Sequence, residues 1–199
     1  MGGGFRGPLF QKKLTIGLKG LYGDGVGRYG DSTIADVTLR PNGMISPLHG
    51  FSALSTVEAN PTNRLMLYFN YGGDYIGRDY TGSGSSAVGY GIRGVAMSGC
   101  YTEVPPSGSD TTQGFDPSAP SNCKANTKSV QEFTAGYWYN IYAGPMGRLR
   151  QGLQYSWVRR DLWSGAGSTT APTGGIANPT GSANGEDNMV FTSLRYYLP

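Results

Sequence analysis

Apolar side chains occupy every second position in several stretches of this chain, with polar side chains between them. In residues 13–22, for example, Leu14 and Leu18 alternate with Thr15 and Lys19. This period of two is typical of a β-strand, whose successive side chains point to opposite faces of the sheet. The same pattern recurs in residues 50–59, 64–75, 129–142, 148–158 and 188–199. The sequence therefore predicts an all-β fold built on these two-faced strands.

The connections between these stretches alternate between short and long. Two are short and contain proline: ANPTN at residues 59–63 and AGPMG at residues 143–147. The others cover residues 23–49, 76–128 and 164–187. Soluble domains seldom contain structureless loops longer than about 15 residues. Outer-membrane barrels, by contrast, join strands by short turns at one end and long loops at the other. The pattern predicts an antiparallel transmembrane β-barrel with long extracellular loops.

The two faces of the predicted strands differ in chemistry. One face carries charged and amide side chains, which suit a water-filled lumen and could set the charge selectivity of a pore. We expect the lumen-facing residues to be Lys19, Glu58, Arg64, Glu132, Arg148, Arg150, Gln154 and Arg195. The alternative is that these charges pair with one another across the wall. The other face carries rings that suit a girdle at the membrane interface, which we expect to comprise Phe69, Tyr71, Tyr137, Tyr139, Tyr155, Trp157 and Tyr196.

The predicted strands are few for a closed barrel. The smallest single-chain outer-membrane barrels have about eight strands, so residues 1–199 are interpreted as one partial barrel domain, the last six to eight strands of a larger one. The alternative is that residues 33–39 and 87–97 supply two further strands and close an eight-stranded barrel. Residues 1–12 lack alternation and are predicted to be a flexible N-terminal segment. They also lack the apolar region of a signal peptide, which suggests a missing beginning.

Composition narrows the class of protein. The chain has 33 glycines and 14 tyrosines, and charged residues make up only 15% of it. Few charges and many aromatics argue against intrinsic disorder. The net charge is +3, and the Lys and Arg residues are scattered rather than clustered on one stripe. Nucleic acid is therefore not expected as a partner.

The two cysteines, Cys100 and Cys123, are the candidates for a disulfide. They have no CxxC spacing and no nearby histidines, so a structural zinc site, which needs about four such ligands, is not expected. A disulfide that closes one loop implies an oxidising compartment. Two unpaired thiols are the alternative.

The chain shows no convincing catalytic constellation. His49, the single histidine, lies in the turn-like segment SPLHG. GSGSS at residues 82–86 lacks the strand-to-helix context of a nucleophile elbow. GDGVGRYG at residues 23–30 lacks the Gly-Lys-Ser/Thr ending of a phosphate-binding loop. We expect neither an enzyme nor a cofactor or metal site.

The chain ends on NMVFTSLRYYLP, residues 188–199. This ending resembles the C-terminal strand of bacterial outer-membrane β-barrel proteins, which the outer-membrane assembly machinery recognises as an insertion signal. The resemblance implies that Leu194, Tyr196 and Leu198 form this signal and face outward. The family pattern usually ends on an aromatic residue, whereas this chain ends on Leu198 and Pro199.

Four short motifs extend the resemblance over nearly the whole chain: GRYG at 27–30, GCYTE at 99–103, GPMGRL at 144–149 and LRYYLP at 194–199. Together they look like the C-terminal part of a family of large, uncharacterised, porin-like outer-membrane proteins of Gram-negative bacteria. The resemblance implies a location in the outer membrane, with membrane lipid and the assembly machinery as partners. It implies no particular chemistry.

These observations lead to one expected function and two alternatives. We expect a pore or transport-type barrel whose polar lumen passes small polar solutes without catalysis. A non-conducting surface anchor or adhesion barrel would instead use the long loops to bind a partner. A secreted all-β binding module would have the same alternating strands, with one face in a core and the other in water.

Overall fold

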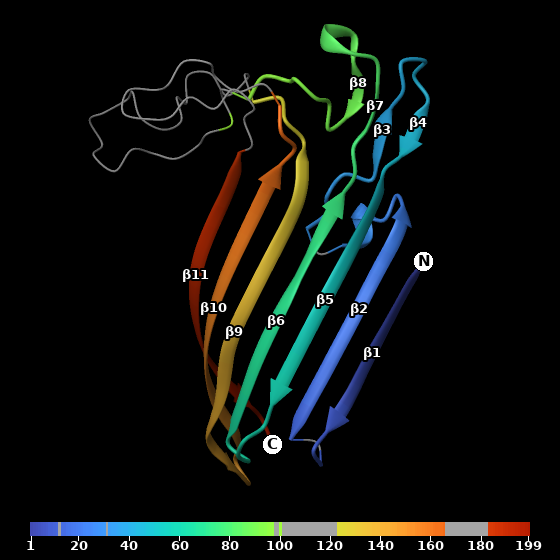
Figure 1. Ribbon diagram of the computed structural model, residues 1–199. Coiled ribbons are helices and arrows are strands. Elements are labelled where there is room, and N and C mark those ends of the chain that lie inside the picture. The colour runs from blue at the N-terminus through green and yellow to red at the C-terminus, as the bar shows by residue number, and fades with distance from the viewer. Residues whose placement is uncertain (12, 31, 98–99, 101–122, 166–182) are drawn as a thin grey trace, which may run out of the picture.

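The computed structural model describes residues 1–11, 13–30, 32–97, 100, 123–165 and 183–199 (Figure 1). Within these residues the chain folds into one large antiparallel sheet, two small two-stranded sheets and two short 3-10 helices. The prediction of an all-β fold is therefore confirmed. In the part of the chain that is described, no helix is long and apolar enough to cross a membrane.

The large sheet has seven strands, each paired antiparallel with the next in the order β1-β2-β5-β6-β9-β10-β11. Each of the six predicted stretches lies largely within one of its strands, and β1 is additional. The strands are β1 (Gly2–Leu9), β2 (Leu14–Asp24), β5 (His49–Ala59), β6 (Leu65–Ile76), β9 (Thr127–Gly144), β10 (Gly147–Leu162) and β11 (Asn184–Tyr197).

Strand β1 corrects the prediction of a flexible N-terminal segment over residues 1–12. It pairs with β2 along its whole length, from Gly2 opposite Leu21 to Leu9 opposite Leu14. Strand pairing uses backbone N–H and C=O groups, so glycines do not prevent it, although they remove the alternating side chains that reveal a strand in the sequence.

The other proposed wall strands also need correction. Within residues 33–39 and 87–97 the structure places only β3 (Val37–Leu39) and β8 (Val88–Tyr90). Each pairs in a separate small sheet, β3 with β4 (Ile45–Pro47) and β8 with β7 (Asp79–Thr81). Three-residue strands cannot cross a bilayer, which takes about nine to eleven tilted residues.

The short and long connections lie at opposite ends of the large sheet, as predicted (Figure 1). The described parts of the long connections fold into a structure that we call the loop cap, formed by residues 25–30, 32–48, 77–97, 100 and 123–126 with β3, β4, β7 and β8. It includes the 3-10 helices η1 (Gly27–Tyr29) and η2 (Gly84–Ser86). Other parts of the long loops, at residues 101–122 and 166–182, lie outside the described residues.

Charged groups join the two hairpins of the loop cap. An Arg40 guanidinium nitrogen lies 3.0 Å from the Asp79 carboxylate, and Arg40 also donates to the Thr81 hydroxyl at 3.1 Å. The Ser46 hydroxyl donates to the same Asp79 at 2.9 Å. At its base, Arg28 pairs with Asp36, which raises the pKa of the guanidinium through hydrogen bonding and Coulombic attraction.

The buried apolar residues also concentrate at this end of the molecule. Two clusters form there, Ile34, Leu48, Ile76 and Tyr90 in one and Met97, Cys100 and Ala183 in the other. The Tyr90 hydroxyl donates to the Thr127 carbonyl at 2.6 Å, and burial raises the pKa of this phenol because the phenolate would lose its hydration. The disulfide between Cys100 and Cys123 is present as predicted and adjoins the second cluster.

Candidate functional site

The large sheet has two chemically distinct faces. Residues directly opposite each other in paired strands share a face, so the register assigns each side chain to one of them. What we call the polar face carries Arg6, Lys19, Ser52, Thr56, Glu58, Asn70, Asp74, Glu132, Thr134, Arg150, Gln154, Ser156 and Arg195. The apolar face carries Phe5, Leu14, Ile16, Leu18, Tyr22, Phe51, Val57, Leu67, Phe69, Tyr71, Phe133, Tyr137, Tyr139, Leu153, Tyr155, Trp157, Val190, Leu194 and Tyr196.

In the inner strands of the sheet, burial is reversed relative to a soluble sheet. On the polar face Asp74, Thr134 and Ser156 are only 4%, 6% and 1% exposed. On the apolar face, by contrast, Phe69 is 46% exposed. The sheet curves, and the lower ends of β9, β10 and β11 bend behind β6 in Figure 1. This curvature crowds the side chains of the polar face, which forms the inner side.

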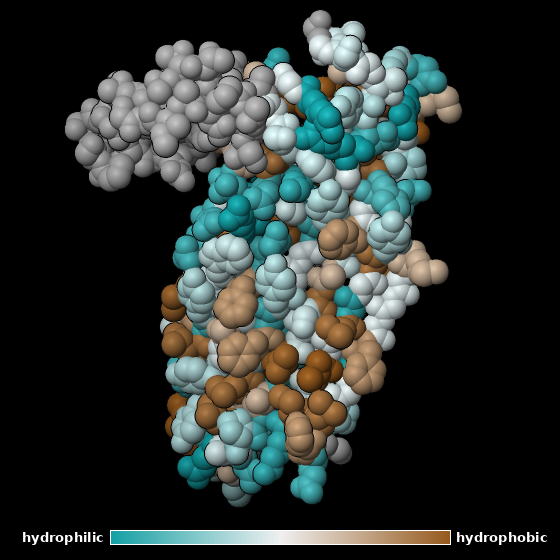
Figure 2. Space-filling model, in the orientation of Figure 1, coloured by the Kyte–Doolittle hydropathy of each residue, from teal (hydrophilic) through white to brown (hydrophobic). Residues whose placement is uncertain are grey.

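The apolar face presents a continuous band to the surroundings. In Figure 2 hydrophobic side chains gather over the middle and lower part of the sheet, between a polar upper end and a polar turn end. All seven residues of the predicted aromatic girdle lie on this face.

Several aromatic side chains at the edges of the band direct their polar atoms away from it. Toward the loop cap, the Tyr71 hydroxyl donates to Gln131 at 2.7 Å and the Tyr155 hydroxyl donates to Asn188 at 2.6 Å. In the same row, the Trp157 indole N–H donates to Glu186 at 3.3 Å. At the turn end, the Tyr196 hydroxyl donates to the Met146 carbonyl. Each ring thus has an apolar body against the band and a polar tip beyond it, the arrangement that suits a membrane interface.

Two of the three residues of the proposed insertion signal lie on the apolar face. Leu194 and Tyr196 are on the apolar face and are 68% and 55% exposed. Leu198 follows the end of β11 and is 81% exposed.

The structure brings most of the predicted lumen residues together on the polar face. Lys19, Glu58, Glu132, Arg150, Gln154 and Arg195 lie there within strands, and Arg148 joins them opposite Tyr197. Arg64 differs, because it precedes β6 in the turn, where its carbonyl accepts the Asn140 N–H at 2.8 Å. Glu58 accepts two hydrogen bonds from Arg6, at 2.8 and 2.9 Å. The alternative that charges pair across the wall therefore holds for Glu58.

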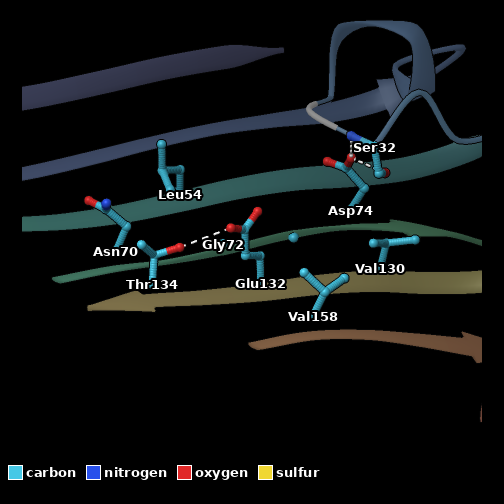
Figure 3. A pocket seen from close by; sticks show the side chains of 10 residues that line it. Ser32, Leu54, Asn70, Gly72, Asp74, Val130, Glu132, Thr134 and Val158 are labelled. Atoms are coloured by element: carbon cyan, nitrogen blue, oxygen red, sulfur yellow. Dashed lines mark hydrogen bonds between the residues drawn. The ribbon is translucent and has the colours of Figure 1, made fainter. Parts of the chain in front are cut away.

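A recess of about 390 Å³ lies in the polar face (Figure 3). It is lined by Ser32, Leu54, Asn70, Gly72, Gly73, Asp74, Val130, Glu132, Thr134 and Val158. Glu132 accepts a hydrogen bond from the Thr134 hydroxyl at 2.9 Å, and neither Glu132 nor Asp74 has an ion-pair partner among the described residues. The recess therefore carries two acidic groups beside the apolar side chains of Leu54, Val130 and Val158.

A segment of the loop cap is fastened to this recess. The Ser32 backbone N–H donates to the Asp74 carboxylate at 2.8 Å, and the Ser32 hydroxyl donates to the same oxygen. Gly30 approaches Asp74 so closely that a Cβ at Gly30 would lie 2.4 Å from a carboxylate oxygen. Gly30 and Ser32 therefore both lie against the polar face at Asp74, and only glycine fits at position 30.

The close contact between Gly30 and Asp74 leads to a first prediction. We expect Gly30→Ala to displace the segment from Asp74 and to speed tryptic cleavage after Arg28, whose side chain is 64% exposed. Overpacking of this kind typically costs about 1–3 kcal/mol. Gly3→Ala is the matched control, because a Cβ there meets nothing within 4 Å. Equal cleavage rates in the two variants would contradict the fastening.

A second group on the polar face is basic and lies near the short turns. The Trp138 ring lies across Gly152, where a Cβ would be 2.8 Å from ring carbons. The Arg195 and Arg150 guanidinium carbons lie 4.4 and 5.1 Å from the centre of this ring. Arg148 lies 4.7 Å from the centre of the Tyr197 ring. We call Arg148, Arg150, Arg195, Trp138 and Tyr197 the arginine cluster.

Comparisons with known proteins add no further information on this site. The chain matches no protein-family model, no curated protein and no solved structure. Within the described residues, no group of three or more His, Cys, Asp or Glu side chains is placed to hold a metal ion. The two chemically distinct sheet faces are therefore the features that bear on function.

Proposed function

We propose that this chain forms part of the wall of an outer-membrane β-barrel whose polar face lines a lumen for small polar solutes. The observation that supports this most is the reversed burial of the inner strands, with Ser156 1% exposed on the polar face and Phe69 46% exposed on the apolar face. Removing apolar surface from water is worth about 25 cal/mol per Å². A face this wide would be strongly unfavourable in water, and lipid is the environment that suits it.

The strand lengths support the same proposal. Strands β2, β5 and β6 have 11, 11 and 12 residues, and β9, β10 and β11 have 18, 16 and 14. A tilted strand needs about nine to eleven residues to cross a bilayer. The longer strands extend beyond the apolar band toward the loop cap, where polar Arg159, Asp161 and Glu186 form ion pairs on the same face.

The barrel we propose includes strands beyond the sheet described above. Strands β1 and β11 are the two edges of the sheet, and both run toward the short-turn end. Pairing these edges directly would give a parallel pair, whereas bacterial barrels of this class are antiparallel with an even number of strands. Unpaired edges are not tolerated in lipid. We infer that an odd number of additional strands completes the wall.

A non-conducting anchor is the second candidate, and one observation favours it. The Ser32–Asp74 hydrogen bonds hold part of the loop cap against the inner face, which narrows the space that a lumen would offer. In this case the barrel would serve to present the loop cap at the cell surface.

The three tryptophans allow a direct test of the two faces. Trp157 lies on the apolar face, Trp138 on the polar face, and Trp163 beside the loop cap. We would prepare three variants that each keep one tryptophan, with Phe at the other two positions, and fold them into phospholipid vesicles. We expect lipids with brominated acyl chains to quench Trp157 strongly and Trp138 and Trp163 weakly. Aqueous iodide should quench Trp163, which serves as the control for solvent access.

The outcomes separate the alternatives. Equal quenching of Trp157 and Trp138 by brominated lipid would contradict the assignment of the faces. Folding in plain buffer, with no quenching of any tryptophan by lipid, would instead support a secreted binding module. Once insertion is established, planar-bilayer conductance separates a pore from an anchor, because only a pore gives discrete current steps.

A further inference from the structure

The arginine cluster contains three positive charges without a negative partner. None of Arg148, Arg150 and Arg195 forms an ion pair with a carboxylate among the described residues, although Arg6 on the same face pairs with Glu58. Arg150 and Arg195 are directly opposite each other in β10 and β11, and Arg148 lies opposite Tyr197 two residues away. Like charges directly opposite in a sheet are destabilising. The arrangement therefore leaves a local excess of positive charge.

The aromatic rings position these guanidinium groups. Arg195 and Arg150 lie against Trp138, and Arg148 lies against Tyr197. A ring attracts the face of a guanidinium and leaves its N–H donors at the edge. Of these donors, the Arg195 Nε donates to the Ser193 hydroxyl at 3.3 Å. Arg150 is directly opposite Arg195, and Arg148 is directly opposite Tyr197 two residues along, so the three cationic groups lie around two neighbouring rings. The Arg150 Nε is buried and has no hydrogen-bond acceptor among the residues that the structure describes.

The chemistry of these donors specifies the type of ligand. Guanidinium groups present parallel N–H donors that match the oxygens of phosphate and sulfate, and such charge-assisted hydrogen bonds are about twice as strong as neutral ones. A tetrahedral oxyanion has enough acceptors for three guanidinium groups and carries the charge that the cluster lacks.

We propose that the arginine cluster binds an oxyanion of the phosphate or sulfate type and makes the lumen selective for solutes that carry such a group. This rests on the proposal that the polar face lines a lumen. The cluster lies near the short turns, whereas the acidic recess with Asp74 and Glu132 lies farther toward the loop cap. A negatively charged solute would therefore bind at the turn end of the wall.

Trp138 gives a direct readout of this binding. In the full chain folded in detergent, with Trp157 and Trp163 replaced by Phe, we would titrate inorganic phosphate at constant ionic strength maintained with sodium chloride. Because Trp138 contacts two of the three arginines, we expect a saturable change in its emission. The double variant Arg150→Gln/Arg195→Gln should weaken phosphate binding about tenfold or more, because charge-assisted hydrogen bonds are lost.

A matched variant controls for the loss of charge. Arg6→Gln/Arg160→Gln also removes two positive charges from the polar face, but Arg6 pairs with Glu58 and Arg160 donates to the Thr127 hydroxyl, both outside the cluster. We expect this variant to bind phosphate within about twofold of the parent, since rim charges screened by salt contribute little. Arg150→Lys keeps the charge without the planar donors and should bind more weakly than the parent. Circular dichroism verifies that each variant is folded.

The results distinguish failure of this inference from failure of the proposed function. No response of Trp138 to phosphate, or an equal response in the Arg150→Gln/Arg195→Gln variant, would overturn the oxyanion site even if the protein conducts. A carboxylate from another strand that occupies the cluster would give this result. Saturable binding without any channel conductance would retain the site and remove the pore.

Discussion

Replacing Phe69 by arginine is expected to destabilise the protein in lipid by about 2 kcal/mol, whereas the same replacement at Asn70 should change stability by less than about 1 kcal/mol. Phe69 lies on the apolar face, two residues below Tyr71 and its interfacial hydrogen bond, with Val57 and Ala135 as cross-strand neighbours. In a barrel this side chain faces acyl chains, and a guanidinium there loses its hydration. The free energy of unfolding, measured by urea titration in phospholipid vesicles, checks the prediction.

Asn70→Arg is a closely matched control. It is the next residue of the same strand, and its side chain lies on the polar face beside the recess of about 390 Å³, which has room for a longer side chain and carries acidic Glu132. The two variants therefore differ mainly in the face that receives the charge.

The comparison also decides between a membrane barrel and a soluble sheet. Phe69 is 46% exposed, and in water a charged residue at such a surface position usually changes stability by less than about 0.5 kcal/mol. Equal stabilities of Phe69→Arg and Asn70→Arg would therefore contradict the proposal that lipid covers the apolar face.

Alternation allowed both faces of the sheet to be predicted from the sequence. Because the side-chain period of a strand is two, Leu18 and Lys19 must lie on opposite sides once the strand is recognised, and the structure places them so. The contrast between short and long connections likewise predicted that the short turns lie at one end of the sheet and the long loops at the other.

Features that depend on contacts between distant residues could not be predicted in this way. Asp74 continues the polar alternation of β6, but its role in fastening the loop cap depends on Ser32, 42 residues away. Arg6 was hidden in a glycine-rich segment without periodicity, and its partner Glu58 is 52 residues away. No local pattern encodes such pairs.

The contacts within the arginine cluster also could not be predicted from the sequence. Trp138 lies between Tyr137 and Tyr139, and the sequence alone draws attention to the outward pair. Its contact with Arg195 spans the intervening strand β10 and depends on Gly152 leaving room for the ring. Arg150 and Arg195 were both predicted to face the lumen, but their direct opposition follows only from the register.

The loop cap depends on the disulfide to a degree that can be measured. Cys100 and Cys123 are 23 residues apart, and a cross-link that closes a loop of this size typically stabilises a structure by about 3 kcal/mol, in the chain-entropy account by restricting the unfolded state. The bond holds together the chain on either side of the loop, where the Lys124 N–H donates to the Ala96 carbonyl at 3.0 Å. Both half-cystines also adjoin the buried Met97 and Ala183.

We expect the Cys100→Ala/Cys123→Ala variant to unfold its loop cap more readily while the large sheet stays folded. A loss of about 3 kcal/mol corresponds to roughly a hundredfold faster amide hydrogen exchange at Lys124, because each 1.4 kcal/mol is a factor of ten. Amides in the middle of β9 and β10 should exchange at unchanged rates, since these strands pair along 16 register positions independently of the disulfide. Chemical reduction of the parent protein should reproduce the effect. Unchanged exchange at Lys124 would show that the two apolar clusters and the Arg40–Asp79 pair hold the loop cap without the disulfide. Faster exchange throughout β9 and β10 would show that the loop cap and the large sheet unfold as one unit.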